Sequence, residues 1–476
     1  MARRQLRSGP PAVLAWRAMA HALEPDRQRR SELAETVVEY LNGWYDAAAE
    51  MKAHGEELDA ETLASFRKPP SESGRSLESI LADLDLAGRD GHMHPSGGHL
   101  SYIPNSGMYT AALGEFLAAG LNRYTGVAAA APGFSAIEHG VVDWLCSIFE
   151  LGPDSSGLLL SGGSMANFTG IVTARTAMLG DEFSDGVVYV TPHTHHSAAK
   201  AARLAGFRAD QVVTVDVDDE LRMSTGSLRE RISSDRAAGL KPFLVIASAG
   251  TTDTGTVDAL NEVADVVAAN QMWLHTDAAY GGFFQLTERG RKVLSGIERA
   301  DSIALDPHKG LSVPFGVGAL VVRDEAALVD AHLGRGAYLL DEDSYNGVRD
   351  MASLGPELSR PFRGLQVWLP LQLHGVAAFR DALEKTLDLA DHAYYRLQGI
   401  NGIETPWRPD LSIVAFRFDD EVGRAALQAV NTERRVHLSP TVVDGRFVLR
   451  FAILNRRTTI DHIDHAIDII EKTLIG

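Results

Sequence analysis

Short apolar runs alternate with helix-like stretches through the middle of the chain. The runs lie at residues 157–160, 187–190, 211–215, 243–247, 272–275 and 302–305, and apolar residues at helical spacing mark 166–177, 197–205 and 228–238 between them. Strands separated by helices predict βαβ crossovers, and therefore a mostly parallel sheet. A further run at 318–322 adds a seventh strand, either parallel or antiparallel.

The two ends of the chain have a different pattern. Residues 1 to about 90 place Leu33, Val37 and Leu41 at helical spacing and carry too few strand signals for a sheet. After Gly364 a helix-rich passage reaches about residue 400, and apolar runs at 411–418 and 446–451 then indicate strands. We therefore predict an α/β protein with an N-terminal helical segment (1–92), a large domain (93–365) and a smaller C-terminal α/β domain (366–476).

The composition narrows the class of protein. Of the 476 residues, 45% are hydrophobic and 23% are charged, as in ordinary soluble globular proteins. The net charge of −18 argues against a nucleic acid or an anionic membrane as partner, because both attract a basic surface. The single cysteine, Cys146, cannot form an intrachain disulfide, and no apolar run approaches the roughly 18 residues of a membrane span. We expect a cytoplasmic enzyme.

A lysine and an aspartate follow two of the predicted strands. Lys309 lies in Asp306-Pro307-His308-Lys309, directly after the run at 302–305, and Asp277 ends the stretch that begins at residue 272. Ligands of open α/β sheets gather at the carboxyl ends of strands, so both side chains are expected to face one crevice. A partly unprotonated lysine attacks an aldehyde, and a carboxylate keeps a pyridine nitrogen protonated. The pair suits pyridoxal 5′-phosphate (PLP) as cofactor.

A glycine-rich turn supplies a candidate anion site. Ser161-Gly162-Gly163-Ser164 follows the run at 157–160 and opens a helix-like stretch. Glycine lets the backbone approach an anion, and the first N–H groups of a helix are unpaired donors. Taken alone, the same residues are also those of an ordinary turn.

Together these motifs resemble those of the group II PLP-dependent amino acid decarboxylases, most closely the aromatic-L-amino-acid decarboxylases. The resemblance rests on residues 275–282 and 306–309, on the glycine-rich turn before them and on residues 447–453, and it extends from about residue 75 to the end. It implies the type I aminotransferase-like PLP fold with a seven-stranded sheet. It also implies decarboxylation of an L-amino acid, an aromatic one, to the amine and CO2 through a Lys309 aldimine.

The resemblance assigns roles to further residues. His196 would stack on the pyridine ring, Ala279 would leave room beneath it, and Asp306 stands where the animal aromatic decarboxylases usually carry an asparagine that binds phosphate. The implied cofactor-binding set is Gly163, Ser164, His196, Thr252, Asp277, Ala279, Asp306, His308, Lys309 and Asn105, and the substrate-binding set is Tyr102, Asn105 and His308. The predicted catalytic residues are Lys309, His196, Asp277 and Tyr345.

Two interpretations from other classes stay open. His193, His195 and His196 could bind the metal of a hydrolase, but no HExxH, CxxC or paired-carboxylate motif accompanies them, so no metal is predicted. A non-catalytic binding protein of the same fold would tolerate the loss of Lys309.

The product depends on a loop between the predicted large and small domains. In the aromatic decarboxylases a tyrosine on this loop protonates the reacting carbon, and relatives without it release an aldehyde. The matching position here falls near Met351, which cannot donate a proton, and Tyr345 lies six residues earlier. Amine formation with Tyr345 as donor is our leading prediction. Decarboxylation-dependent oxidative deamination, or another PLP-dependent carbon–carbon lyase reaction, is the alternative.

The resemblance finally implies a homodimer with shared active sites. The N-terminal helices would pack across the partner, and residues 124–132 would reach the neighbouring site. Alanines at 128–131 stand where relatives have bulkier residues, so the pocket is expected to be wider or differently lined.

Overall fold

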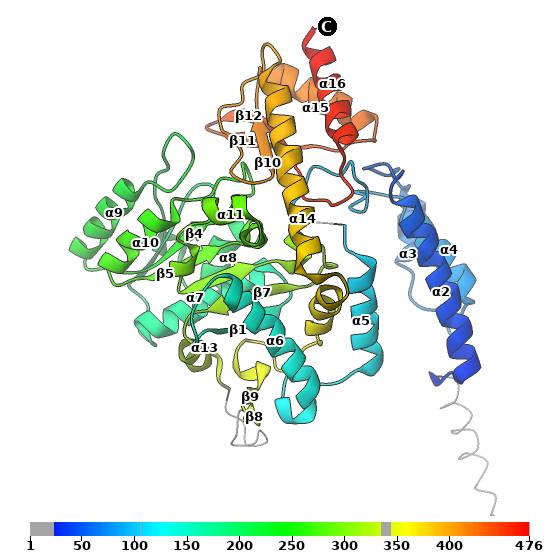
Figure 1. The fold of residues 1–476 in the computed structure, drawn as a ribbon, viewed down its shortest axis with the longest axis horizontal. Helices are drawn as coiled ribbons and strands as arrows, with labels where there is room; N and C mark the ends of the chain where they lie inside the picture. Colours follow the sequence, from blue (N-terminus) through cyan, green and yellow to red (C-terminus); the bar gives the residue numbers. More distant parts are fainter. Residues whose placement is uncertain (1–22, 105, 335–343, 476) are drawn as a thin grey trace, which may run out of the picture. The chain divides into compact units, whose positions relative to one another are not determined.

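The computed structural model describes residues 23–104, 106–334 and 344–475 (Figure 1). Within them the chain divides into two units. The first contains the residues up to Met51 together with Gly55–Gly91, and the second contains Lys52–His54 together with the chain from His92 onward. Among the described residues, no helix is both long and apolar enough to cross a membrane.

The first unit consists of helices, as predicted. They are α2 (Arg27–Ala47), α3 (Ala60–Phe66) and α4 (Leu77–Ala87). Each begins at a residue whose side chain accepts a hydrogen bond from the first turn: Asp26, Asp59 and Ser76. No residue of these three helices is buried.

The second unit is built around a seven-stranded sheet, which confirms the predicted fold class. Its strands are β1 (Ser156–Leu160), β2 (Gly186–Val190), β3 (Val212–Thr214), β4 (Lys241–Ser248), β5 (Trp273–Asp277), β6 (Ser302–Leu305) and β7 (Gly318–Val322). They lie in the order β1-β7-β6-β5-β4-β2-β3, and β7 is antiparallel to both of its neighbours. The strand at 318–322, whose direction the sequence left open, is therefore the antiparallel one.

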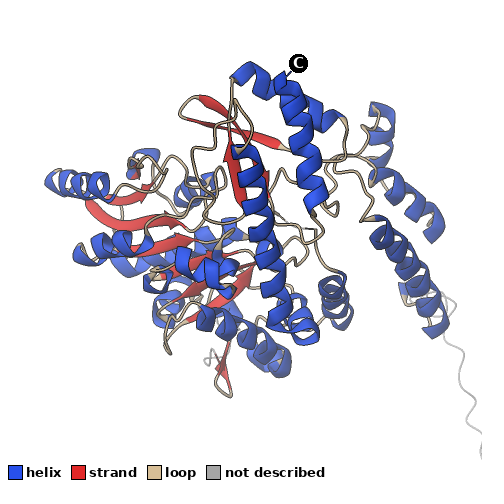
Figure 2. Cartoon of the chain, turned by 45° about the horizontal axis from the view of Figure 1, so that its top comes forward, coloured by secondary structure: helices blue, strands red, loops and turns tan. Residues whose placement is uncertain are grey.

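Helices cover the large sheet on both sides (Figure 2). They include α6 (Pro132–Ile148), α7 (Gly163–Leu179), α8 (His196–Leu204), α9 (Thr225–Ala237), α10 (Leu260–Ala269) and α13 (Glu325–His332). Helix α7 packs on the central strands and against α8 and α13. A Cβ atom at Gly170 would lie 2.8 Å from the His275 ring, so only glycine allows α7 to approach β5 this closely.

A smaller antiparallel sheet forms the C-terminal part, in the order β10-β12-β11. Its strands are β10 (Ile413–Phe416), β11 (Ser439–Val443) and β12 (Arg446–Ala452), and they pack with α15 (Asp420–Thr432) and α16 (Ile460–Ile475). The sequence predicted β10 and β12 but missed β11. This edge strand contains Pro440 and alternates between buried and exposed residues, so it lacks a continuous apolar run.

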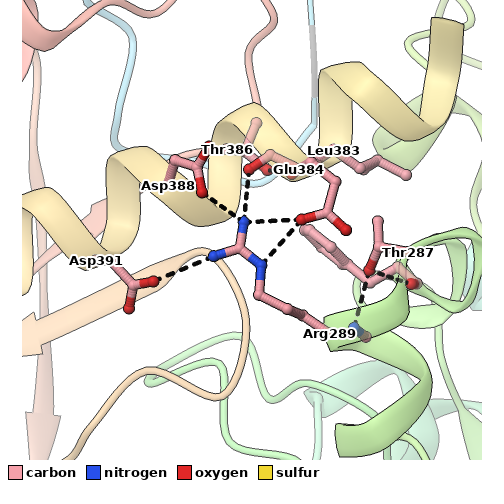
Figure 3. A network of polar contacts seen from close by, with 9 residues as sticks. Thr287, Arg289, Leu383, Glu384, Thr386, Asp388 and Asp391 are labelled. Atoms are coloured by element: carbon pink, nitrogen blue, oxygen red, sulfur yellow. Dashed lines mark hydrogen bonds and ion pairs between the residues drawn. The ribbon is translucent and has the colours of Figure 1, made fainter.

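An ion-pair network joins the sheet domain to the long helix α14 (Gly364–Gln398), which is kinked at Gly375 (Figure 3). Arg289, on α11 (Glu288–Val293), lies 2.9 Å from Glu384, 2.7 Å from Asp388 and 3.2 Å from Asp391. The acids recur at the spacing of one helical turn, so they line one face of α14. Because these groups are partly exposed, the network positions the helix more than it stabilises the fold.

Candidate active site

A cavity of about 400 Å³ opens where several strands of the large sheet end. Its walls come from the turns after β1, β2, β4, β5 and β6, from residues 102–104 and from strand β12. The lining residues are Tyr102, Ile103, Pro104, Ser161, Gly162, Gly163, Ser164, Met165, Asn167, His195, Ser197, Ser248, Gly250, Thr251, Thr252, Asp277, Ala279, Tyr280, Asp306, His308, Lys309 and Arg450. Most of the predicted site residues therefore meet at one place.

Lys309 lies on the one-turn helix α12 (Pro307–Gly310), directly after β6. Its Nζ is 3.0 Å from Oδ2 of the buried Asp306, which holds the amine at the cavity wall. His308 Nδ1 hydrogen-bonds the carbonyl oxygen of Val317 at 2.8 Å, and burial lowers the pKa of this histidine. The His308 imidazole beside Lys309 is therefore held in a fixed orientation, and its neutral form is favoured by burial.

The glycine-rich turn forms a narrow part of the cavity. Helix α7 begins at Gly163, and a Cβ atom there would lie 2.9 Å from Asp306 Oδ2 and 3.0 Å from the Ala279 Cβ. Ser164 follows with its side chain exposed. The N-terminal N–H groups of a helix of this length are suited to an anion such as phosphate. The missing side chain of Gly163 keeps the space in front of them open.

Asp277 ends β5 and is only 8% exposed. Its Oδ2 accepts a hydrogen bond from Asn167 Nδ2 at 2.9 Å, and its Oδ1 accepts one from the Ala279 backbone N–H at 3.2 Å. Each carboxylate oxygen has a further lone pair, so the group can accept a hydrogen bond from a protonated ring nitrogen.

Of the two adjacent histidines, the structure places His195 in the cavity lining and not the predicted His196. His195, the N-cap residue of α8, lines the cavity, whereas His196 is exposed at the first position of the helix and is absent from the cavity lining. His195 is turned inward because its Nδ1 contacts Ser197 Oγ at 2.8 Å and the Ser197 backbone N–H at 3.3 Å. Burial lowers the pKa of His195, although the Asp277 charge opposes the shift.

Two cavity residues were missed by the sequence interpretation. Arg450 donates hydrogen bonds to the carbonyl oxygens of Ser101 (3.2 Å) and Thr252 and to Ser439 Oγ (3.1 Å), so it ties β12 to two loops of the cavity. Burial lowers its pKa. The sequence feature that could have identified Arg450 is that it is the one charged residue inside the apolar run 447–453. Asn167, one turn into α7, gave no signal beyond its place in the glycine-rich motif.

Some predicted residues do not enter the cavity of their own chain. Tyr345 lies on the short hairpin of β8 (Ser344–Tyr345) and β9 (Val348–Arg349), is 44% exposed and is absent from the cavity lining. Asn105 lies outside the described residues. His193 Nδ1 lies 3.7 Å from Asp253 Oδ2. Within the described parts of the chain, no three ligating side chains are arranged to hold a metal.

The comparison with protein families is decisive. Residues 70–419 match the pyridoxal-dependent decarboxylase conserved domain. The chain belongs to the pyridoxal-dependent decarboxylase family. Its cofactor is PLP, and it is a PLP-dependent carboxy-lyase, as predicted.

Relatives match almost the whole length of this decarboxylase. It is 33% identical to an aromatic-L-amino-acid decarboxylase from Bacillus atrophaeus over 92% of each chain, and 28% identical to tryptophan decarboxylase 1 from Oryza sativa, again over 92% of each. The crystal structure of Oryza sativa TDC with PLP and tryptamine superposes with a TM-score of 0.90 at 25% identity, covering 95% of this chain and 99% of that one.

The cavity fits the cofactor on its own chemistry. An amine, an acceptor carboxylate and a helix N-terminus lie on its walls, as an aldehyde, a ring nitrogen and a phosphate require. Asp306 Oδ1 is buried and has no hydrogen-bond partner among the described residues. A buried acceptor of this kind normally receives a hydrogen bond, so a donor on a bound group could supply one here.

A first prediction tests the cradle at Gly163. We expect Gly163→Ala to weaken PLP binding at least about tenfold, because the added methyl group enters the space in front of Asp306 and Ala279. Fluorescence titration of the apoprotein with PLP measures this. The matched control is Gly133→Ala, at a helix position where no atom lies within 4 Å of the new Cβ. Equal affinities of the two variants would contradict the assignment.

Proposed function

We propose that this enzyme removes the carboxyl group of an aromatic L-amino acid and releases the amine and CO2. The observation that carries the proposal is the meeting of Lys309, Asp277 and His195 at one cavity. The substrate class is supported by the 33% identity to an aromatic-L-amino-acid decarboxylase and by the likeness to the Oryza sativa structure with tryptamine. The lone, buried Cys146, whose thiol pKa is raised by burial to about 11, is consistent with a cytoplasmic location.

Each cavity residue is assigned a role from its contacts. Lys309 attaches the cofactor, and the Asp306 carboxylate orients its amine. Asp277 keeps a proton on the ring nitrogen, since an ionised carboxylate only accepts hydrogen bonds. Bound PLP supplies an electron-withdrawing ring that stabilises the charge left when CO2 departs. Ala279 would leave room beneath the ring, and His195, which lines the cavity, would cover the other face, the role that the sequence had given to His196.

The substrate enters between the cofactor wall and the half-exposed Tyr102. Which bond breaks depends on how the substrate carboxylate is held, so the residues around it control selectivity. We assign this positioning to Tyr102 and His308, while Gly163, Ser164 and Thr252 hold the cofactor. Arg450 keeps the Tyr102 and Thr252 loops in place through its hydrogen bonds to their backbones.

A panel of amino acids tests the reaction. We expect amine and CO2 from aromatic substrates, measured by mass spectrometry, and a loss of at least about 1,000-fold in Lys309→Ala. Borohydride reduction and peptide mapping should find the pyridoxyl group on Lys309. Lys200→Ala, an exposed lysine of α8, is the control and should retain activity. Release of CO2 from acidic amino acids alone would contradict the substrate class.

Tyr345 is proposed as the proton donor that directs the reaction to the amine. Its side chain is exposed on the β8–β9 hairpin, which packs against residues Ala128–Ala130. We expect Tyr345→Phe to divert product from amine to aldehyde, the outcome of the alternative oxidative reaction, with Tyr395→Phe, an exposed tyrosine of α14, as control. An unchanged amine yield in Tyr345→Phe would exclude this role, and aldehyde from the wild type would favour the oxidative alternative.

A homodimer with shared sites is proposed on two features of the chain. The described helices α2, α3 and α4 bury no residue, and helix α5 (Tyr109–Leu121), which packs on α14, exposes Phe116, Leu117 and Leu121. Adjacent exposed apolar side chains mark association surfaces. In a dimer the Tyr345 hairpin and residues 124–132 would reach the partner's cavity.

Light scattering checks the dimer. We expect a mass of two 51.4 kDa chains for the wild type, and a shift toward the single chain with loss of activity in Phe116→Glu, because a charge replaces a side chain that is 67% exposed in the monomer. Leu204→Glu, at a leucine of α8 that is 66% exposed, is the matched control. A fully active monomer would refute the shared site.

A further inference from the structure

A chain of buried hydrogen bonds lies directly behind the cavity. Trp273, His275 and Asp277 alternate along β5, so their side chains share one face of the sheet. The neighbouring strand β6 places Ser302 opposite His275, and α7 covers this face and brings Asn167 to it. These five side chains connect the cavity with the interior of the sheet.

The donors and acceptors at the two ends fix the direction of this chain. Trp273 Nε1 can only donate, and it lies 2.8 Å from Ser302 Oγ. The Ser302 hydroxyl can then donate to His275 Nδ1, also at 2.8 Å. In this direction His275 carries its proton on Nε2, which lies 2.9 Å from Asn167 Oδ1.

The far end of the chain requires the same direction. The Asp277 carboxylate only accepts, so the amide nitrogen of Asn167 must face it at 2.9 Å. The second N–H of the same amide donates to Ser197 Oγ at 3.0 Å. The Asn167 amide thus contacts His275 through its oxygen and hydrogen-bonds two cavity residues, Asp277 and Ser197, through its nitrogen.

The branch through Ser197 ends on the cavity histidine. Ser197 Oγ accepts from Asn167, so its hydroxyl proton is directed to His195 Nδ1 at 2.8 Å. The Ser197 backbone N–H also points to this nitrogen. His195 Nδ1 is therefore an acceptor, and its proton lies on Nε2.

We propose that Asn167 is a positioning residue which, with its amide oxygen on His275 of the Trp273–Ser302–His275 chain, sets both the acceptor face of Asp277 and the Nε2–H tautomer of His195. The inference rests on the proposed function of Asp277 and His195. It explains why a tryptophan and a histidine with no access to the cavity carry polar contacts inside the sheet. Burial lowers the pKa of His275 to about 4, so this link of the chain is neutral at neutral pH.

The test uses the apoprotein and PLP binding together. In wild type, ¹⁵N spectra of labelled histidines should show His195 and His275 as Nε2–H tautomers, with the signals assigned from His195→Gln and His275→Gln. In Asn167→Leu, which keeps the volume and removes the amide, we expect mixed tautomers for both histidines and PLP affinity reduced about 10- to 100-fold. Trp273→Phe should leave His275 as the Nε2–H tautomer, because Asp277 keeps the Asn167 amide nitrogen and the amide oxygen therefore still accepts from His275 Nε2.

The control is Thr169→Val, which is also buried on α7 but whose lost hydroxyl donates to the Met165 carbonyl oxygen of its own helix. It should leave tautomers and affinity unchanged. Unchanged tautomers in Asn167→Leu, or the same changes in Thr169→Val, would overturn the proposal. The spectra need no substrate, so a wild type that releases no amine would refute the proposed function and leave this result intact.

Discussion

The structure depends on the burial of one carboxylate. Asp277 stands at the end of a central strand beneath helix α7, where it is almost entirely removed from water. A buried charge of this kind is tolerated only when hydrogen bonds surround it, because desolvation otherwise costs several kcal/mol. The approach of α7 permitted by Gly170, the amide of Asn167 and the backbone N–H of Ala279 meet that need together.

The same packing accounts for the rest of the site. Because α7 must lie close to β5, its N-terminus opens on the cavity beside Gly163, and its first turns carry Asn167 to the sheet. Strand β6 then places Ser302 next to His275 at its start and Lys309 in the turn after its end. Phosphate site, carboxylate and reactive amine are thus consequences of one helix–sheet contact.

The sequence predicted the parts of this arrangement that have local signals. All seven strands of the large sheet, Lys309 and Asp277 follow from apolar runs and the residues that end them. Strand β11 could not be predicted in this way, because it is an edge strand with exposed positions and therefore has no continuous apolar run. The resemblance pointed to His196, whereas His195 lines the cavity, because the direction of the His195 side chain depends on its cap contact with Ser197. Asn167 and Arg450 act through residues more than a hundred positions away, and the domain boundaries and site roles assigned from sequence stay predictions.

Arg450 connects the C-terminal sheet directly to the cavity. Its guanidinium joins β12 to the Thr252 and Ser101 loops, and Tyr280 of the cavity wall shares its hydroxyl with Ser412 at 2.9 Å. The small sheet is therefore a wall of the cofactor site. A ligand that binds only the folded cavity therefore also stabilises that sheet, by thermodynamic linkage. Occupancy of the active site and the folding of the C-terminal sheet are consequently coupled.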